Sequence, residues 1–397
     1  MRRSVAILAC VPGLVLFLAV SLFGGVAARA ASPVEIPVVL PLTGGAAFLG
    51  QGERHALQIL EKVVNETGGI GGAPVRFTFH DDQTSPAVAV QLTSQIKTAN
   101  PPVIIGSALV AMCNAMAPLT QGGPVLYCLS PGIHPAAGTR VFSSFISTSD
   151  LARALLRYYR GRGFTRLALI TSTDASGQDG KRSFEAALKL PENASLHIVA
   201  SVQFNTTDVS VAAQVQEMKA AHPQAVIAWT SGSPMGTVLK GIAEGGLNVP
   251  VATTDANMTY AQMKQYASFL PSEMLLMSSE WPPHSAGVTL DPKVLAAQKL
   301  MFDAYAAAGI APDVTVALAW DPAMLVVDAM RKLGRGASPE QIRAYLAAVK
   351  GWAGINGIYD FTARPQRGLD VGDAVVTRWL PDKKSWTIVS KPGGAPL

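Results

Sequence analysis

Short apolar runs alternate with longer amphipathic segments over the N-terminal third of the chain. The apolar runs, which we predict to be buried strands, are Val34–Leu40, Val75–His80, Val103–Ile105 and Val125–Leu129. The segments between them, which we predict to be helices, are Gln51–Glu66, Pro86–Ala99 and Ala111–Leu119. Runs of this kind are typical of parallel strands that are covered on both faces. The pattern therefore predicts a parallel sheet with helices packed on both sides.

The same alternation restarts after an extended segment, Val141–Ile146, and a helix-capping sequence, Ser147-Thr148-Ser149-Asp150. The strands predicted in this second series are Arg166–Thr171, Leu196–Val202, Ala225–Trp229, Val249–Thr253 and Met274–Ser278. The helices predicted around them are Leu151–Arg162, Ala175–Leu190, Val209–Ala221, Pro234–Gly245 and Tyr260–Phe269. The predicted fold class is therefore α/β, with two doubly wound parallel-sheet lobes.

The pattern changes after Trp281-Pro282-Pro283. Three helices then follow with no strand between them: Val294–Ala308, Val314–Leu333 and Pro339–Val349. Pro322 lies inside the second of these, so we expect that helix to kink or to begin there. The tail has the pattern of short strands with a hairpin at Pro381-Asp382. These strands are Ile358–Phe361, Ala374–Leu380 and Ser385–Val389. Because three helices cannot make a sheet domain of their own, they must cover a sheet formed earlier.

Two loops of small residues follow neighbouring strands of the first predicted sheet. Gly106-Ser107-Ala108 ends the strand at Ile105, and Ser130-Pro131-Gly132 ends the strand at Leu129. The carboxyl ends of adjacent parallel strands are where open α/β sheets bind ligands. Hydroxyl and backbone N–H groups near helix N-termini suit a carboxylate or another small anion. Two such loops side by side favour a binding site over a pair of ordinary tight turns.

Residues 1–30 have the pattern of a secretory signal peptide. Arg2 and Arg3 precede an apolar run, and Ala28-Arg29-Ala30 is a small-residue cleavage site. An uncleaved membrane anchor is the alternative, which Pro12-Gly13 inside the run disfavours. Cys10 lies too early in the run to be a convincing lipid-attachment cysteine.

The charge is modest once this segment is set aside. The formal net charge is +5, of which the three arginines of residues 1–30 supply +3. The residues after the predicted signal peptide contain no stripe of lysine and arginine, which argues against nucleic-acid binding. Cys113 and Cys128 are the two cysteines beyond the signal peptide. In an exported protein they either form a disulfide or remain buried thiols, and the sequence leaves both open.

Motifs of the common enzyme classes are missing from the sequence. Gly68-Gly69-Ile70-Gly71-Gly72 follows a helix and opens a strand, which is the reverse of a dinucleotide-binding loop. There is no Walker A lysine, no paired-histidine metal motif and no nucleophile elbow. Asp81-Asp82 fits acids that close a strand and cap the next helix better than a metal pair. We therefore predict that the protein is not an enzyme and has no cofactor and no metal site.

Several of these stretches resemble one known family, the periplasmic solute-binding proteins of branched-chain amino-acid (Leu/Ile/Val) transporters. The resemblance lies in Pro41-Leu42-Thr43-Gly44, Gly68–Gly72, His80-Asp81-Asp82-Gln83 and the two loops after Ile105 and Leu129. Each motif alone is weak, but they occur in the family's order along most of the chain. The resemblance implies a type I periplasmic binding fold, in which two lobes close on a small ligand.

The resemblance also implies how the chain is divided and what it does. Residues 31–147 and 282–355 would form lobe 1, residues 148–281 and 356–397 lobe 2, with three hinge strands near 147, 281 and 356. The implied function is capture of a branched-chain or other apolar amino acid in the cleft for an ABC transporter. The implied partner is the permease in the inner membrane, and the protein would be a periplasmic monomer.

The resemblance places ligand contacts in loops of both lobes. Asp255 stands where similar proteins have an acid that pairs with the α-ammonium group of an amino acid. The alternative is that Asp255 caps a helix beginning near Thr259 or forms an Asx-turn. The residues that we predict to contact the ligand are Phe48, Ser107, Ala108, Leu109, Ser130, Pro131, Gly132, Ile133, His134, Ser176, Ser231, Gly232, Asp255 and Trp281.

The chain departs from the family where the side chain of the ligand would lie. Ser176-Gly177 replaces the usual Tyr-Gly, Gly232-Ser233 replaces aromatic residues, and His134 stands where relatives often have threonine. Three aromatic residues could take their place from other directions: Phe48, Trp229 and Trp281. An aromatic or aliphatic carboxylate is therefore the alternative ligand. A ligand sensor of the same fold that serves no transporter is the alternative function.

Overall fold

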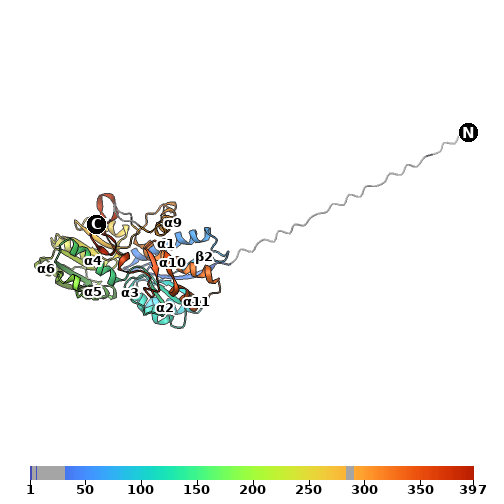
Figure 1. Cartoon of the computed structure of the whole chain (residues 1–397), viewed down its shortest axis with the longest axis horizontal. Coiled ribbons are helices and arrows are strands. Elements are labelled where there is room, and N and C mark those ends of the chain that lie inside the picture. The colour runs from blue at the N-terminus through green and yellow to red at the C-terminus, as the bar shows by residue number, and fades with distance from the viewer. Residues whose placement is uncertain (2–5, 7–31, 283–289) are drawn as a thin grey trace. The chain divides into compact units, whose positions relative to one another are not determined.

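The computed structural model describes residues 32–282 and 290–397, together with residues 1 and 6 (Figure 1). Apart from residues 1 and 6, the predicted signal peptide lies outside the described residues, and so does Cys10. Within the described part of the chain, no helix combines the length and apolarity needed to cross a membrane.

Among the described residues, five parallel strands form the first sheet, in the order β2-β1-β3-β4-β5. They are β1 (Val34–Leu40), β2 (Val75–Asp81), β3 (Val103–Gly106), β4 (Val125–Cys128) and β5 (Val141–Ser143). The helices that connect the first four are α1 (Ala47–Glu66), α2 (Pro86–Lys97) and α3 (Val110–Met116). The winding direction reverses between β1 and β3, which is the point where doubly wound sheets bind ligands.

Seven described strands form the second sheet, in the order β14-β13-β10-β9-β8-β6-β7. The parallel strands are β6 (Arg166–Ser172), β7 (His197–Phe204), β8 (Ala225–Trp229), β9 (Val251–Thr253) and β10 (Met274–Ser278). The edge is an antiparallel hairpin of β13 (Val375–Leu380) and β14 (Ser385–Ile388), which confirms the hairpin predicted at Pro381-Asp382. The helices of this half are α4 (Thr148–Gly161), α5 (Ala175–Leu188), α6 (Ala212–Ala220), α7 (Pro234–Glu244) and α8 (Tyr260–Gln265).

The late helices return to the first sheet. They are α9 (Pro292–Ala308), α10 (Val314–Leu333) and α11 (Pro339–Ala348). Helix α10 packs along α1 and against β3, and α11 packs against β4. Figure 1 shows α1, α2, α10 and α11 gathered in one half and α4, α5 and α6 in the other. Helix α10 does not begin at Pro322 but continues through it.

Two details differ from the expectations. An antiparallel pair of β11 (Lys350–Ala353) and β12 (Ile358–Asp360) follows α11, and β11 was not predicted. The helix after β2 is capped by Ser85, whose side chain accepts a hydrogen bond from the Val88 N–H. The expectation that Asp81 and Asp82 cap this helix is therefore wrong, because both carboxylates hold neighbouring loops instead.

The described residues confirm an α/β fold with two mainly parallel sheets. The chain passes from the first sheet to the second after β5, leaves the second sheet after β10 for the helices that pack on the first, and returns to the second sheet after β12. Apolar side chains of the first sheet, such as Val39, Ile104 and Leu126, pack on Met112 and Met116 of α3 with almost no exposure. The lobe boundaries near 147, 281 and 355 stay a prediction.

Candidate functional site

A small cavity lies between the two sheets, at the carboxyl ends of their parallel strands. The lining residues on the first-sheet side are Leu49, Ala108, Leu109, Val110, Ser130, Pro131, Gly132 and, from α10, Leu318. Those on the second-sheet side are Thr148, Ser176, Trp229, Ser231, Thr254, Asp255 and Ala256. The cavity volume is about 20 Å³, which is room for about one water molecule. A cavity of this size does not hold a molecule as large as an amino acid.

Many of the predicted ligand contacts meet at this cavity. The predicted residues that line it are Ala108, Leu109, Ser130, Pro131, Gly132, Ser176, Ser231 and Asp255. They come from loops far apart in the sequence, which the topology brings to one point because all follow the carboxyl ends of parallel strands. The cavity residues outside that prediction lie in helices or, in the case of Thr254, directly after a strand. These are Leu49, Val110, Thr148, Thr254, Ala256 and Leu318.

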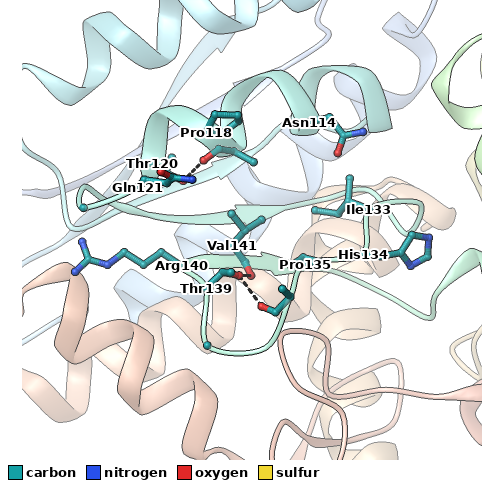
Figure 2. A pocket seen from close by; sticks show the side chains of 14 residues that line it. Asn114, Pro118, Thr120, Gln121, Ile133, His134, Pro135, Thr139, Arg140 and Val141 are labelled. Atoms are coloured by element: carbon teal, nitrogen blue, oxygen red, sulfur yellow. Dashed lines mark hydrogen bonds between the residues drawn. The ribbon is translucent and has the colours of Figure 1, made fainter.

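The other predicted residues lie around the cavity without lining it. Ile133 and His134 line a separate groove of about 630 Å³ beside α3, shown in Figure 2. Phe48 is half-buried in the first turn of α1, and the Gly232 N–H donates to Asn257 Oδ1 at 3.2 Å. Trp281 is buried, and its indole N–H has no hydrogen-bond partner. Direct contact between these residues and a ligand stays a prediction.

Ser107 is the predicted residue whose hydroxyl is already engaged. It is fully buried, and its Oγ donates a hydrogen bond to Asp82 Oδ2 at 2.5 Å. The preceding Gly106 has φ +108°, and a Cβ there would lie 1.9 Å from the Val39 carbonyl oxygen. Only glycine therefore fits where β3 turns close to β1. Ser107 thus connects the first ligand loop to the end of β2.

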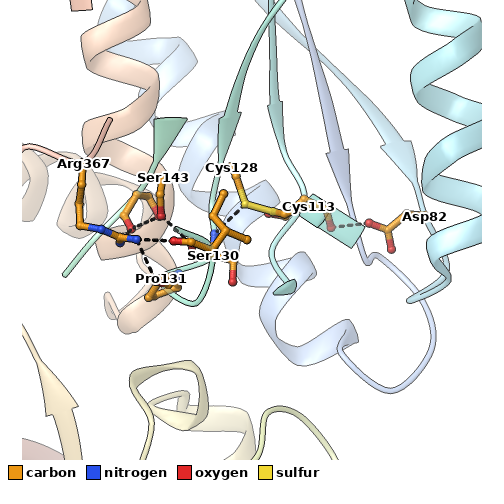
Figure 3. The surroundings of a disulfide bond; sticks show 10 residues. Asp82, Cys113, Cys128, Ser130, Pro131, Ser143 and Arg367 are labelled. Atoms are coloured by element: carbon orange, nitrogen blue, oxygen red, sulfur yellow. Dashed lines mark hydrogen bonds between the residues drawn. A yellow bond between two sulfur atoms is a disulfide. The ribbon is translucent and has the colours of Figure 1, made fainter. Parts of the chain in front are cut away.

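A disulfide joins Cys113 of α3 to Cys128 at the end of β4, close to the loop that contains Ser130 and Pro131 (Figure 3). The Cα atoms of the two cysteines are 6.0 Å apart. Of the two states that the sequence left open, the structure has the paired one. A disulfide fits an exported protein, because such bonds persist in oxidising compartments.

Arg367 is a positioning residue that sequence reasoning missed. It is buried, and its guanidinium donates to the carbonyl oxygens of Pro131 and Ile133 in one ligand loop. It also donates to the carbonyls of Ser144 and Phe145, so it ties that loop to the segment after β5 (Figure 3). Burial lowers the pKa of Arg367 to about 10. No sequence motif surrounds Arg367, and its partners lie more than 200 residues away.

Asp255 is the acid of the cavity. It follows β9, is 1% exposed, and accepts one side-chain hydrogen bond at Oδ1, from the Thr254 hydroxyl at 2.6 Å. Among the described residues, its Oδ2 has no hydrogen-bond partner. Burial raises the pKa of Asp255 to about 6. Helix α8 is capped by Thr259, so the alternative that Asp255 caps it is wrong.

The surroundings of Asp255 are acidic. Glu53 of α1 is fully buried, and neither of its carboxylate oxygens has a hydrogen-bond partner. Burial, together with Asp82, Asp313 and Asp255, raises the pKa of Glu53 well above its usual value. No lysine, arginine or histidine is among the residues described as lining the cavity. This charge distribution favours a ligand group that is cationic or neutral at this end of the cavity.

Trp229 supplies the aromatic surface of the cavity. It is the last residue of β8, and its ring packs edge-on against Phe184 with centroids 5.1 Å apart. Gly180 makes room for the ring, because a Cβ there would lie 2.1 Å from Trp229 Cδ1. Of the three aromatic residues proposed to replace the family's tyrosines, Trp229 is the one that lines the cavity. No group of three or more metal-ligating side chains occurs among the described residues.

Comparisons with known proteins agree on the fold. A family profile described as "Periplasmic binding protein" matches residues 33–384. A periplasmic binding protein type 1 from Bordetella pertussis Tohama I has a TM-score of 0.77 and 21% identity, covering 92% of this chain and 100% of its own. The branched-chain amino acid transporter substrate-binding protein LivJ from Streptococcus pneumoniae, in complex with isoleucine, has a TM-score of 0.74 and 19% identity, covering 90% and 99%.

A solute-binding protein of an ABC transporter from R. palustris, in complex with benzoate, is similar to the same degree. Its TM-score is 0.74 at 19% identity, and the match covers 92% of this chain and 97% of that one. No curated protein matches the sequence. At these identities, the solved structures show a common fold and leave the ligand open.

Proposed function

The chain belongs to the periplasmic binding protein family, and from this membership we propose that it is the solute-binding component of an ABC transporter. Proteins of this family bind small ligands outside the cytoplasm and work with membrane permeases. The proposed ligand is an amino acid with an apolar side chain, branched-chain or other. The proposed location is the periplasm, reached through a cleaved signal peptide, and the proposed state is a monomer that delivers its ligand to the permease.

The observation that carries this proposal is the unused oxygen of Asp255. A buried carboxylate normally has all its oxygens hydrogen-bonded, because each one left without a partner costs free energy. Asp255 lines the cavity, and its buried Oδ2 has no hydrogen-bond partner among the described residues. The α-ammonium group of an amino acid would supply a charge-assisted hydrogen bond there.

The opposite side of the cavity suits the carboxylate of the same ligand. The loops at Ala108–Val110 and Ser130–Gly132 contribute neutral groups only. Ser130 is 3% exposed, and its hydroxyl takes part in no hydrogen bond among the described residues. A zwitterion would thus place its anionic end on the first-sheet loops and its cationic end on Asp255. Leu49, Leu318 and Trp229 would surround its side chain.

Hinge motion follows from the size of the cavity. About 20 Å³ is far too small for an amino acid, so the two halves must separate to admit one. The proposed hinge is the set of connections near residues 147, 281 and 356. Two of these connections touch one another, because the Ser279 hydroxyl donates to Asn356 Oδ1 at 2.6 Å.

An aromatic or aliphatic carboxylate is the second candidate ligand. It is favoured by Trp229 in the cavity and by the benzoate-binding protein of the same fold. A simple carboxylate would leave Asp255 and Glu53 without a cationic partner. For this reason the amino acid remains the first choice.

A thermal-shift screen of the twenty common amino acids, benzoate and short-chain carboxylates tests the proposal. A ligand that binds the folded state raises the melting temperature by mass action. We expect an amino-acid hit that Asp255→Asn abolishes. A hit limited to carboxylates without an amino group, and unaffected by Asp255→Asn, would overturn the amino-acid assignment.

The absence of enzyme motifs adds a second test. The protein, incubated with ester, amide and nucleotide substrates, is expected to release no product over many turnovers. Transport is separated from sensing by uptake of the radiolabelled hit into cells. We expect uptake to require the gene of this protein, whereas a sensor would leave uptake unchanged.

A further inference from the structure

One histidine and one aspartate connect the two halves of the molecule at the edge of the cavity. His134 belongs to the loop after β4, on the side of the first sheet, and Asp179 belongs to α5, on the side of the second. His134 Nε2 lies 2.8 Å from Asp179 Oδ1. The His134 side chain is 47% exposed and that of Asp179 is 4% exposed. Figure 2 shows the ring of His134 at the end of the 133–141 loop.

Asp179 lies directly over the ligand loop. A Cβ on Gly132, which lines the cavity, would be 3.0 Å from Asp179 Oδ2. The same Cβ would lie 2.6 Å from Val110 Cγ2, so glycine is needed where Asp179 and Val110 both approach the loop. The His134–Asp179 pair thus joins the two halves next to Gly132, a residue that lines the cavity.

Few other groups hold the Asp179 carboxylate. Arg182, one turn along α5 and 67% exposed, lies 3.6 Å from Oδ1, and Oδ2 has no hydrogen-bond partner. The buried Arg367 interacts electrostatically with both Asp179 and Asp150 of α4, but its hydrogen bonds go to backbone carbonyls. His134 is therefore the group that donates a close hydrogen bond to a nearly buried carboxylate.

Two backbone contacts near the cavity are weaker. Within the described residues, the Ser233 N–H donates to the Gly45 carbonyl at 3.1 Å, and the Val314 N–H donates to the Met258 carbonyl at 3.2 Å. Both are neutral pairs, and hydrogen bonds to an ionised group are about twice as strong as neutral ones. The His134–Asp179 bond is thus stronger than either of these two backbone contacts.

We propose that His134 and Asp179 form a latch that holds the cleft closed and slows release of the ligand. The inference rests on the proposed function, because it requires that the two halves open and close. In the open state Asp179 would face water, which replaces the lost partner. In the closed state without His134 it would be buried with no close donor. Removing the latch therefore acts on the equilibrium between open and closed forms.

The latch is tested by measuring the distance between the halves directly. Spin labels on Lys62→Cys in α1 and Lys240→Cys in α7 report this distance, because these exposed side chains lie on opposite halves. Cys113 and Cys128 are joined in a disulfide and do not take the label. Distance distributions are recorded without added ligand and with saturating L-leucine, L-isoleucine, L-valine or benzoate, for the wild-type background and each variant.

In the wild-type background we expect a short-distance, closed population. His134→Ala and Asp179→Asn should each lower its ratio to the open population about tenfold, the loss typical of a hydrogen bond to a charged group. His134→Gln keeps a donor and should restore part of the ratio. The double variant should lose little beyond either single variant, because both remove the same contact. His197→Ala, the same change at an exposed histidine of β7, should have no effect.

Two results would overturn the latch. One is a closed population that His134→Ala and Asp179→Asn leave unchanged. The other is a wild-type protein that shows no closed population under any of these conditions. If none of the four compounds changes the distances but the variants alter the ligand-free distribution, the latch stands and the ligand assignment fails. If a compound closes the cleft equally in all variants, the ligand assignment stands and the latch fails.

Discussion

Asp255 and Asp321 are two fully buried aspartates in different regions of the molecule, and burial raises the pKa of each to about 6. Asp321, on α10, accepts hydrogen bonds from the backbone N–H groups of Ile355 and Asn356 at 2.9 and 3.1 Å. It also accepts from the Asn356 side chain at 2.9 Å and from the Tyr359 hydroxyl at 3.0 Å. Asp255 accepts one side-chain hydrogen bond, from Thr254, and the backbone N–H groups of Asp255 and Ala256 also lower its pKa, while its Oδ2 has no hydrogen-bond partner among the described residues.

The difference teaches how to interpret a shifted pKa. Both carboxyls are equally buried, so the raised pKa alone does not distinguish a structural acid from a ligand-binding one. The hydrogen-bond partners of the two carboxyl groups do distinguish the structural acid from the ligand-binding one. Asp321 fastens α10 to the segment after β11, and its donors are provided by the fold. Asp255 leaves an oxygen for a donor that the fold does not provide.

The largest expected effect is the loss of stability when Asp321 is removed. Asp321→Ala leaves the Ile355 and Asn356 N–H groups and the Tyr359 hydroxyl buried without their acceptor. We expect the free energy of unfolding to fall by about 3–5 kcal/mol, the range for breaking a buried polar network. Urea unfolding followed by circular dichroism measures this. Asp303→Ala, at an exposed ion pair of α9, is the control and should cost under about 0.5 kcal/mol.

A loss below about 1 kcal/mol in Asp321→Ala would contradict the comparison. It would mean that the two aspartates are equally dispensable to the fold and that the hydrogen bonds of Asp321 are not structural.

The two aspartates also differ in how far their roles could be predicted from the sequence. Asp255 follows directly after a predicted strand, so its place at the ligand edge of the sheet follows from the topology and the family resemblance. Asp321 sits beside a proline inside a helix, and its partners lie 34 to 38 residues further along the chain. No local pattern indicates such partners, because they are brought together only by packing.

The same contrast between topology and packing explains which other residues of the site could be predicted from the sequence. Loop residues after strands, such as Ser130 and Ser231, could be predicted because parallel strands end at one edge. Glu53 and Leu318 reach the cavity region from helices, where burial looks like ordinary core packing in the sequence. Arg367 lies in an irregular segment and contacts loops more than 200 residues away. The strand β11 was missed because Lys350–Ala353 is short and contains a glycine.

Asp255→Asn should separate binding from stability. We expect the affinity for the amino-acid hit to fall by at least about 2 kcal/mol, because the buried ammonium group loses its charged partner. Without ligand, the free energy of unfolding should stay unchanged or rise by about 1 kcal/mol, since the variant removes a buried charge. Isothermal titration calorimetry and urea unfolding give the two numbers.

Asp174→Asn is the matched control in the same half. Asp174 caps α5 and accepts from the Gly177 N–H at 2.9 Å, so its loss should weaken the fold rather than binding. If Asp255→Asn behaved as this control does, Asp255 would be a structural acid like Asp321.

The pH dependence of binding sharpens the comparison further. A bound ammonium group needs the ionised form of Asp255, so affinity should be highest above pH 6 and fall about tenfold per pH unit below it. A simple carboxylate ligand would show the opposite slope, since protonation of Asp255 removes a repulsive charge. Titrations between pH 5 and pH 8 measure the slope. Asp255→Asn should flatten this slope if Asp255 is the group responsible for it.

Without ligand, the free energy of unfolding should depend on pH through both Asp255 and Asp321. The raised pKa of each means that the folded protein binds more protons than the unfolded chain between about pH 4 and pH 6. Each group therefore contributes stability that is complete below about pH 4 and is lost as the pH rises through about 6. Chemical unfolding in that range should show this decline, and Asp255→Asn should remove only part of it.

The smallest effect concerns two serines that look equivalent in the sequence, since each follows a strand of the first sheet. Ser107 is fully buried, and its hydroxyl bonds to Asp82, which also accepts from the Thr84 N–H at 2.9 Å. Ser130 lines the cavity, and its hydroxyl is unused among the described residues. The Ser107 hydroxyl thus resembles the Asp321 carboxylate, because both have hydrogen-bond partners within the fold. The Ser130 hydroxyl resembles Asp255 Oδ2, because both lack such a partner among the described residues.

Alanine at the two positions should therefore have opposite consequences. Ser107→Ala leaves the buried Asp82 short of a donor, and we expect it to lower the free energy of unfolding by about 1–3 kcal/mol with little change in ligand affinity. Ser130→Ala should weaken binding by about 1 kcal/mol and leave the ligand-free stability nearly unchanged. Calorimetry and urea unfolding on both variants give the full set of four values. Equal losses of affinity in both variants would show that the Ser107 hydroxyl leaves Asp82 and binds the ligand. In that case, hydrogen-bond partners within the fold would not distinguish structural from ligand-binding groups on the first-sheet side.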